Sequence, residues 1–151
     1  METVTVERTI DAPVDTVFAW ISNAHNYTRT PLVVSERLRT PGRDAPYGVG
    51  AIRVLTWLIG WFAERITAYV PPHSFDYHVY RSFPPSRHEA GQVTVDDVGG
   101  ASRVIWTTTF ELAIPLVGPM LTRRVGKPLV GYAFGRVLDG AAKELSAQPP
   151  Q

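Results

Sequence analysis

The chain has 151 residues, a formal net charge of +1, 44% hydrophobic and 19% charged residues, and no cysteine. This length fits one domain that can bury a core without disulfides, and the near-neutral charge gives no reason to expect a nucleic-acid partner. The lack of cysteine excludes a disulfide framework, a thiol nucleophile and a zinc–thiolate site, and it is typical of a reducing compartment.

The chain begins with an alternating segment, METVTVERTIDAP, which lacks the basic and then apolar regions of a signal peptide. The most apolar run, residues 51–63, is shorter than the roughly 20 residues of a membrane-spanning helix and contains Arg53. We therefore expect a cytoplasmic protein without stable membrane insertion. We expect a single domain over residues 1–147 and a loose tail at residues 148–151.

Alternation of polar and apolar residues predicts a first strand over residues 3–10. Pro13 then fits the first turn of a helix that ends near Ser22 and has an apolar face with Val17 and Phe18. The next segment, residues 23–32, is polar and contains Pro31, which indicates a short second helix or a turn.

Six further strands are predicted, separated by Pro and Gly turn signals. They cover residues 33–40, 49–57, 62–69, 74–83, 88–98 and 102–112. Gly99-Gly100 is a two-residue hairpin signal between the last two strands. From Lys127 to Leu145, apolar residues recur at steps of three and four, which predicts a long C-terminal helix. Pro128 lies in its first turn, or marks a kink if residues 116–124 are also helical.

This order of elements predicts an α+β fold in which one long helix lies across a curved antiparallel sheet. Four segments also carry a family resemblance, namely VERTIDAPVDTVFAWISN, GVGAIRVLT, ERITAYVPPHSFDYHV and ASRVIWTTTFEL. In this order they resemble the START-like (SRPBCC, helix-grip) superfamily, specifically its bacterial polyketide cyclase/dehydrase-like branch. The resemblance implies a seven-stranded sheet wrapped around the C-terminal helix and a cavity for an apolar or amphipathic molecule. It implies a fold more firmly than a reaction.

Strand alternation and helix spacing predict which side chains face such a cavity. Tyr77 and Trp106 each offer a broad ring with one hydrogen-bonding group. We expect the ligand to contact Trp57, Tyr77, Val79, Arg81, Trp106, Thr108, Phe110, Met120, Arg124, Val130 and Phe134. Arg81, His88, Glu89 and Arg124 are the polar residues expected nearest the opening; the alternative for each is a solvated or salt-bridged surface residue.

Two surface features have more than one interpretation. The hairpin tip at residues 56–62, TWLIGWF, is apolar where polar turn residues are usual. It is a gate at the cavity mouth, a protein contact or homodimer patch, or a segment that folds back onto the core. The basic cluster of Arg123, Arg124 and Lys127 fits an anionic head group or a membrane surface, or else a solvated helix start.

Signatures of catalysis are missing from the sequence. The four histidines lack metal-ligand spacing, so we expect no metal. Gly48-Val49-Gly50 opens a strand, whereas a dinucleotide fingerprint opens a helix, and we expect no cofactor. The candidates for proton transfer are Tyr77, Arg81 and His88, because burial can shift the pKa of such groups.

The leading hypothesis is a protein that binds or carries a small apolar or amphipathic ligand, lipid-like or polyketide-like, between the helix and the sheet. The alternative is a polyketide cyclase or dehydratase that uses Tyr, Arg or His side chains of the pocket. A third hypothesis is a protein-interaction module, which exposure of Trp57 and Trp61 would favour.

Overall fold

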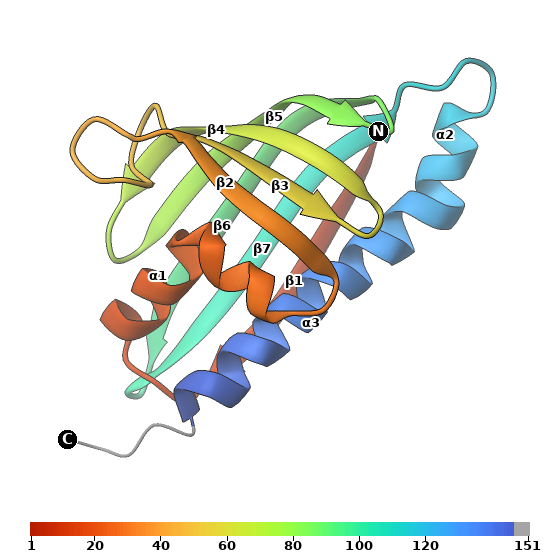
Figure 1. Cartoon of the computed structure of the whole chain (residues 1–151). Coiled ribbons are helices and arrows are strands. Elements are labelled where there is room, and N and C mark those ends of the chain that lie inside the picture. Colours follow the sequence, from red (N-terminus) through yellow and green to blue (C-terminus); the bar gives the residue numbers. More distant parts are fainter. Residues whose placement is uncertain (147–151) are drawn as a thin grey trace.

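The computed structural model describes residues 1–146 as a single antiparallel sheet that curves around a long helix (Figure 1). Its strands are β1 (Glu2–Ile10), β2 (Val33–Thr40), β3 (Ile52–Trp57), β4 (Gly60–Val70), β5 (Ser74–Phe83), β6 (Ser86–Val98) and β7 (Ala101–Leu112). They lie in the order β1-β7-β6-β5-β4-β3-β2, so the first strand pairs with the last. The expected α+β, helix-grip architecture with a seven-stranded sheet is confirmed. The expected tail at residues 148–151 lies outside the described residues.

The helices lie between β1 and β2 and after β7. They are α1 (Val14–Ser22), a 3₁₀ helix η1 (Ala24–Arg29), α2 (Gly118–Leu121), a π-helical turn η2 (Thr122–Gly126) and α3 (Lys127–Ser146). Pro13 is the N-cap of α1, one position earlier than the first turn predicted for it. The short second helix predicted between residues 23 and 32 is η1, whose first turn is capped by the side chain of Asn23.

The long C-terminal helix extends further toward its N-terminus than Lys127, because α2, η2 and α3 follow one another without a break. Pro128 cannot donate a backbone hydrogen bond, and its ring would crowd the carbonyl four residues earlier in an α-helix. The chain meets this with a wider π turn, in which the Lys127 N–H donates to the Thr122 carbonyl. Pro128 therefore lies directly after a π turn, at the second residue of α3.

The core fills the space between α3 and the sheet. The buried residues of α3 repeat with helical spacing and are Ala133, Gly135, Val137, Leu138, Ala141 and Leu145. Phe134, also on α3, stacks its ring on that of Trp106 on β7, with the ring centroids 3.8 Å apart. This stack joins the C-terminal helix to the last strand, and the remaining gap between helix and sheet lies on the side of Phe134 nearer to α2.

Two tight turns fix the ends of the central hairpins. Gly99 and Gly100 have φ of 73° and 92°, so the predicted β6–β7 hairpin is confirmed at the residues that tolerate this left-handed region. Gly60, with φ of 146°, begins β4, and a Cβ atom there would overlap the Phe83 carbonyl. The β3–β4 turn is therefore packed against the end of β5.

Candidate ligand-binding cavity

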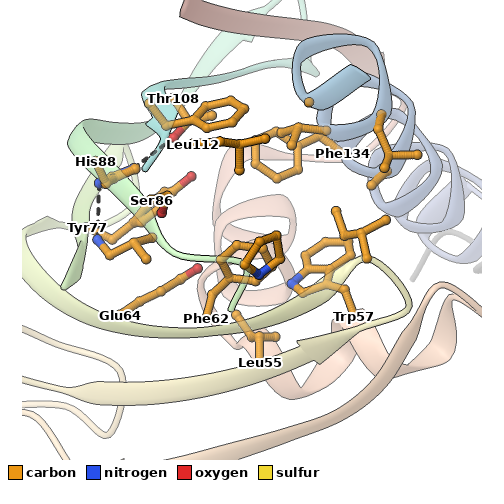
Figure 2. Close-up of a pocket in the computed structure, with 18 of the residues that line it drawn as sticks. Leu55, Trp57, Phe62, Glu64, Tyr77, Ser86, His88, Thr108, Leu112 and Phe134 are labelled. Carbon is orange, nitrogen blue, oxygen red and sulfur yellow. Dashed lines mark hydrogen bonds between the residues drawn. The ribbon is translucent and has the colours of Figure 1, made fainter. Parts of the chain in front are cut away.

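A cavity of about 180 Å³ lies between α3 and the inner face of the sheet (Figure 2). In Figure 2, Phe62 and Trp57 lie on one side of it and Leu112 and Phe134 on the other. Most of its wall is apolar. The apolar side chains of the wall are Leu55, Trp57, Ile59, Phe62, Val79, Trp106, Phe110, Leu112, Val125, Leu129, Val130, Ala133 and Phe134. The polar side chains of the wall are Glu64, Tyr77, Ser86, His88 and Thr108. An apolar cavity with a few polar groups is the usual make-up of a small-molecule site.

Most residues predicted to face a cavity are brought together in this wall. They are Trp57, Tyr77, Val79, Trp106, Thr108, Phe110, Val130 and Phe134, with His88 beside them. Regular strands keep a period of two, so every second residue of β5 and β7 points inward. Whether these side chains contact a ligand stays a prediction.

Arg81 lies outside the cavity, and the inward position expected for it is wrong. In the β4–β5 ladder, Ala63 pairs with Arg81 while its neighbour Glu64 pairs with Val79, so β5 contains one extra residue. Such a bulge reverses the alternation beyond it. The Arg81 side chain is exposed on the outer face, with its guanidinium 6.0 Å from the ring centre of Trp61.

Met120 and Arg124 also lie outside the cavity, contrary to expectation, because both are exposed and neither belongs to its wall. The sequence left open whether residues 116–124 are helical and did not indicate a π turn. The π turn adds residues to one turn and rotates the face that follows. As a result Val125 and Leu129 line the cavity instead. Glu89 is likewise exposed and outside the wall, because it directly follows the inward-facing His88 on β6.

The apolar hairpin tip is divided between core, cavity and surface. Trp57 is buried, and Ile59 and Phe62 belong to the cavity wall. Leu58 is exposed, and Trp61 is half-buried beneath Arg81. The tip thus supplies one side of the cavity, and the burial of Trp57 argues against the protein-interaction hypothesis.

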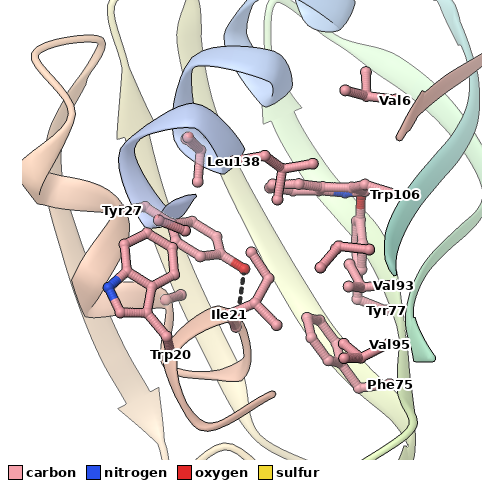
Figure 3. Packing of buried hydrophobic residues seen from close by; sticks show 14 of the residues in the cluster. Val6, Trp20, Ile21, Tyr27, Phe75, Tyr77, Val93, Val95, Trp106 and Leu138 are labelled. Carbon is pink, nitrogen blue, oxygen red and sulfur yellow. Dashed lines mark hydrogen bonds between the residues drawn. The ribbon is translucent and has the colours of Figure 1, made fainter. Parts of the chain in front are cut away.

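A buried ion pair, which the sequence reasoning missed, forms behind the cavity wall. Arg53 Nε donates to Glu64 Oε1 at 2.8 Å, and β3 and β4 hold the two residues directly opposite each other. The terminal nitrogens of Arg53 have no hydrogen-bond partner among the described residues. Its guanidinium carbon lies 5.3–5.7 Å from the ring centres of Tyr27, Phe75 and Tyr77, within cation–π range. Figure 3 shows these three rings in the core.

The Glu64 carboxylate is shared between this ion pair and the cavity. Burial raises the pKa of Glu64, while Arg53 opposes that rise. We take Glu64 to be ionised, because a protonated Glu64 would leave the fully buried Arg53 cation without a counterion. In Figure 2 the end of the Glu64 side chain points into the cavity. The second carboxylate oxygen, Oε2, has no hydrogen bond to the residues that the structure describes.

His88 is held by hydrogen bonds on both ring nitrogens (Figure 2). Its Nδ1 accepts from the Val79 N–H at 3.1 Å, so Nδ1 carries no proton. In the neutral ring the proton is therefore on Nε2, which donates to Thr108 Oγ1 at 2.8 Å. Burial, with help from nearby His78, lowers the pKa of His88 to about 4. The ring is neutral at physiological pH and replaces a strand hydrogen bond of β5, which is a structural role.

Tyr77 and Trp106 form a second fixed polar contact in the wall. Trp106 Nε1 donates to the Tyr77 hydroxyl at 2.8 Å, and the Tyr77 ring stacks on His88 with centroids 5.6 Å apart. Burial raises the pKa of Tyr77, so its hydroxyl stays protonated. The hydrogen bond from Trp106 and the stacking on His88 fix the position of Tyr77 in the cavity wall. Among residues 1–146, no cluster of three or more His, Asp or Glu side chains could hold a metal ion.

The family model for polyketide cyclase/dehydrase and lipid transport proteins matches residues 1–148. The chain belongs to this family. No curated protein matches it. No helix within residues 1–146 has the length and apolar character needed to span a membrane.

Solved structures show the family fold at low sequence identity. The Zhui aromatase/cyclase from a Streptomyces species is 15% identical, with a TM-score of 0.79 over 96% of this chain and 93% of that chain. The protein TTHA0849 from Thermus thermophilus is 18% identical, with a TM-score of 0.78 over 97% and 98%. A START superfamily protein from Mycobacterium smegmatis is 14% identical, with a TM-score of 0.74 over 95% and 98%. At these identities the similarity to the solved structures shows a shared fold and nothing more.

Proposed function

We propose that this family member binds a small, mainly apolar ligand whose hydrogen-bond donor faces Glu64. The observation that carries the proposal is a cavity walled by Trp57, Trp106 and Phe134 into which a single carboxylate points. Burial of apolar surface supplies the affinity, at roughly 25 cal/mol per Å². The carboxylate supplies the selectivity.

The volume of the cavity sets the size of the ligand. About 180 Å³ is slightly larger than an engineered cavity of roughly 150 Å³ that holds benzene, and smaller than the range of drug-sized pockets. A ligand with one or two rings fits within the wall. A longer lipid-like or polyketide-like chain would extend through the opening beside Val125 and Leu129, which line the cavity but are 52% and 40% exposed.

The free oxygen of Glu64 favours a ligand that carries an O–H or N–H group. Glu64 Oε2 is accessible from the cavity, and a ligand that displaces water from it without donating a hydrogen bond would leave it unpaired, whereas a ligand donor keeps it paired. A ligand carboxylate at the same place would be repelled by the like charge. We therefore favour phenols, alcohols and amines over acids of the same shape.

The cyclase or dehydratase alternative is less well supported by the side chains present. Neither nitrogen of His88 is free to accept a proton from a substrate, because Nδ1 is occupied by Val79 and Nε2 already carries a proton. Arg81 lies on the outer face. We therefore propose that the protein binds its ligand without turnover. We further propose that it is cytoplasmic and needs neither nucleic acid nor a cofactor. A homodimer is the alternative to a monomer.

Calorimetric titration with three matched compounds tests the proposal. A naphthol offers a donor, its methyl ether offers none, and the corresponding naphthoic acid offers a carboxylate. At roughly 0.6 kcal/mol per non-hydrogen atom, we expect a Kd on the order of 10 µM for the naphthol. The ether should bind about tenfold more weakly and the acid more weakly still. Equal affinity for all three would rule out the role given to Glu64, and no binding by any of them would count against the cavity as a site.

A further inference from the structure

Exposed apolar side chains gather around the opening of the cavity. Val125 and Leu129 line the cavity and are also exposed, which places the opening at the start of the C-terminal helix. We use the name mouth surface for this region, formed by the exposed residues Leu58, Leu116, Met120, Val125 and Leu129. Leu58 belongs to it because it lies between the wall residues Trp57 and Ile59, at the tip of the β3–β4 turn.

The loop before α2 is the most exposed part of the mouth surface. It protrudes beyond the end of the sheet in Figure 1. Leu116 in this loop is fully exposed, with a φ of 72° that is unfavourable for a non-glycine residue. A large apolar side chain held in water on a strained backbone contributes nothing to the core. The exposed position of Leu116 is explained if a non-aqueous surface covers its side chain.

The charged residues in the chain segment that carries Leu116, Met120, Val125 and Leu129 are all basic. Between Glu111 and Asp139 the sequence has no acidic residue and four basic ones. Three of these, Arg123, Arg124 and Lys127, are exposed in the same helical segment as Val125 and Leu129. None of the three forms an ion pair with a residue that the structure describes. Apolar and basic side chains together are typical of segments that lie in the interface of an anionic bilayer.

We propose that the mouth surface docks on an anionic lipid bilayer, so that the cavity opens directly toward the membrane. The apolar residues come from two separate chain segments, the β3–β4 turn and residues 116–129, and the second of these protrudes beyond the sheet, which suits a deformable surface better than a rigid protein partner. The cations face the lipid phosphates while the apolar tips enter the head-group region. An apolar ligand would then pass between membrane and cavity without crossing water.

Vesicle sedimentation of the intact protein, without added ligand, tests this proposal separately from ligand binding. The vesicles are phosphatidylcholine alone or phosphatidylcholine mixed with phosphatidylserine. We expect binding to the mixed vesicles only. The variant Arg123→Gln/Arg124→Gln/Lys127→Gln should bind them roughly 100-fold more weakly. The matched control Arg37→Gln/Arg39→Gln/Arg43→Gln removes three exposed cations from β2 and the loop after it, and should bind as the wild type does.

A second variant, Leu116→Ser, tests the apolar part of the surface, and we expect about tenfold weaker binding. The proposal is overturned if the wild type ignores mixed vesicles, binds both kinds equally, or loses binding equally in the control variant. Sedimentation velocity tests whether a second copy of the chain covers this surface instead of lipid. A wild-type dimer that Leu116→Ser dissociates would assign the mouth surface to a second copy of the chain and overturn docking on lipid.

Discussion

Arg53 Nε donates a hydrogen bond of 2.8 Å to Glu64 Oε1 across the β3–β4 pair, and both side chains are buried. The pair connects the core to the cavity. Arg53 is enclosed by aromatic rings on the core side, and Glu64 reaches the cavity on the other. Each charge is tolerated because the other is present, and the acceptor offered to a ligand depends on Arg53 as much as on Glu64.

Replacement of one partner of this pair should be far more damaging than replacement of both. We expect Arg53→Met to lower the free energy of unfolding by about 3–5 kcal/mol, because it leaves Glu64 buried without a counterion. The double variant Arg53→Met/Glu64→Leu should recover most of that loss, since two apolar side chains fill the same space. Urea denaturation of the two variants and the wild type measures this. A double variant no more stable than Arg53→Met would contradict the coupling of the pair.

The lowered pKa of His88 should make stability depend on pH in a definite direction. The folded protein binds this proton only near pH 4, whereas the unfolded chain binds it near the ordinary value of 6.5. Between these values the unfolded state holds more protons, so the free energy of unfolding falls as pH is lowered from 6.5 toward 4. Allowing for solvent screening at the partly exposed ring, we expect a loss of about 2 kcal/mol.

His88→Gln provides the control for this pH effect, since an amide keeps a donor and an acceptor but does not titrate. Denaturation of both proteins at several pH values gives the difference between them. The same loss in His88→Gln would assign the effect to other groups. Nitrogen NMR of the wild type at pH 5.5, between the two values, should show a neutral ring protonated on Nε2, and a charged ring at that pH would contradict the structural role of His88.

Gly91 should not tolerate a side chain, whereas Gly131 should. A Cβ atom at Gly91 would overlap the ring of Tyr77, which cannot move aside because it is held by Trp106 and stacked on His88. We expect Gly91→Ala to cost about 2 kcal/mol or more. Gly131 lies in α3, where the nearest atom to an added Cβ would be Val4 Cγ1 at 3.6 Å, so Gly131→Ala should be neutral or stabilise by up to about 1 kcal/mol. Equal effects in thermal denaturation would contradict the tight packing of Tyr77.

The inward face of a regular strand could be predicted from the sequence alone. Tyr77, Val79, Trp106 and Thr108 were placed correctly in the wall because alternation is a property of every uninterrupted strand. Arg81 was placed wrongly because a bulge depends on tertiary pairing, and no local signal in the sequence marks it.

The other differences between prediction and structure concern the start of the C-terminal helix and Glu64. Met120 and Arg124 were placed wrongly because the period of a helix changes at a π turn. Glu64 was missed although a signal existed, since it alternates in phase with the apolar residues Phe62 and Ile66 on a strand. A charged residue on an apolar face predicts a buried partner on the neighbouring strand, which here is Arg53.

Native mass spectrometry of the purified protein, compared with a cavity-filling variant, tests the central claim most directly. Ala133→Leu places a larger apolar side chain in the wall, while Ala142→Leu adds the same atoms to α3 outside it. We expect the wild type and Ala142→Leu to bind one naphthol per chain, and Ala133→Leu to remain empty while it stays folded. Binding that is unchanged in Ala133→Leu, or absent from the wild type, would contradict a ligand site in the cavity between the helix and the sheet.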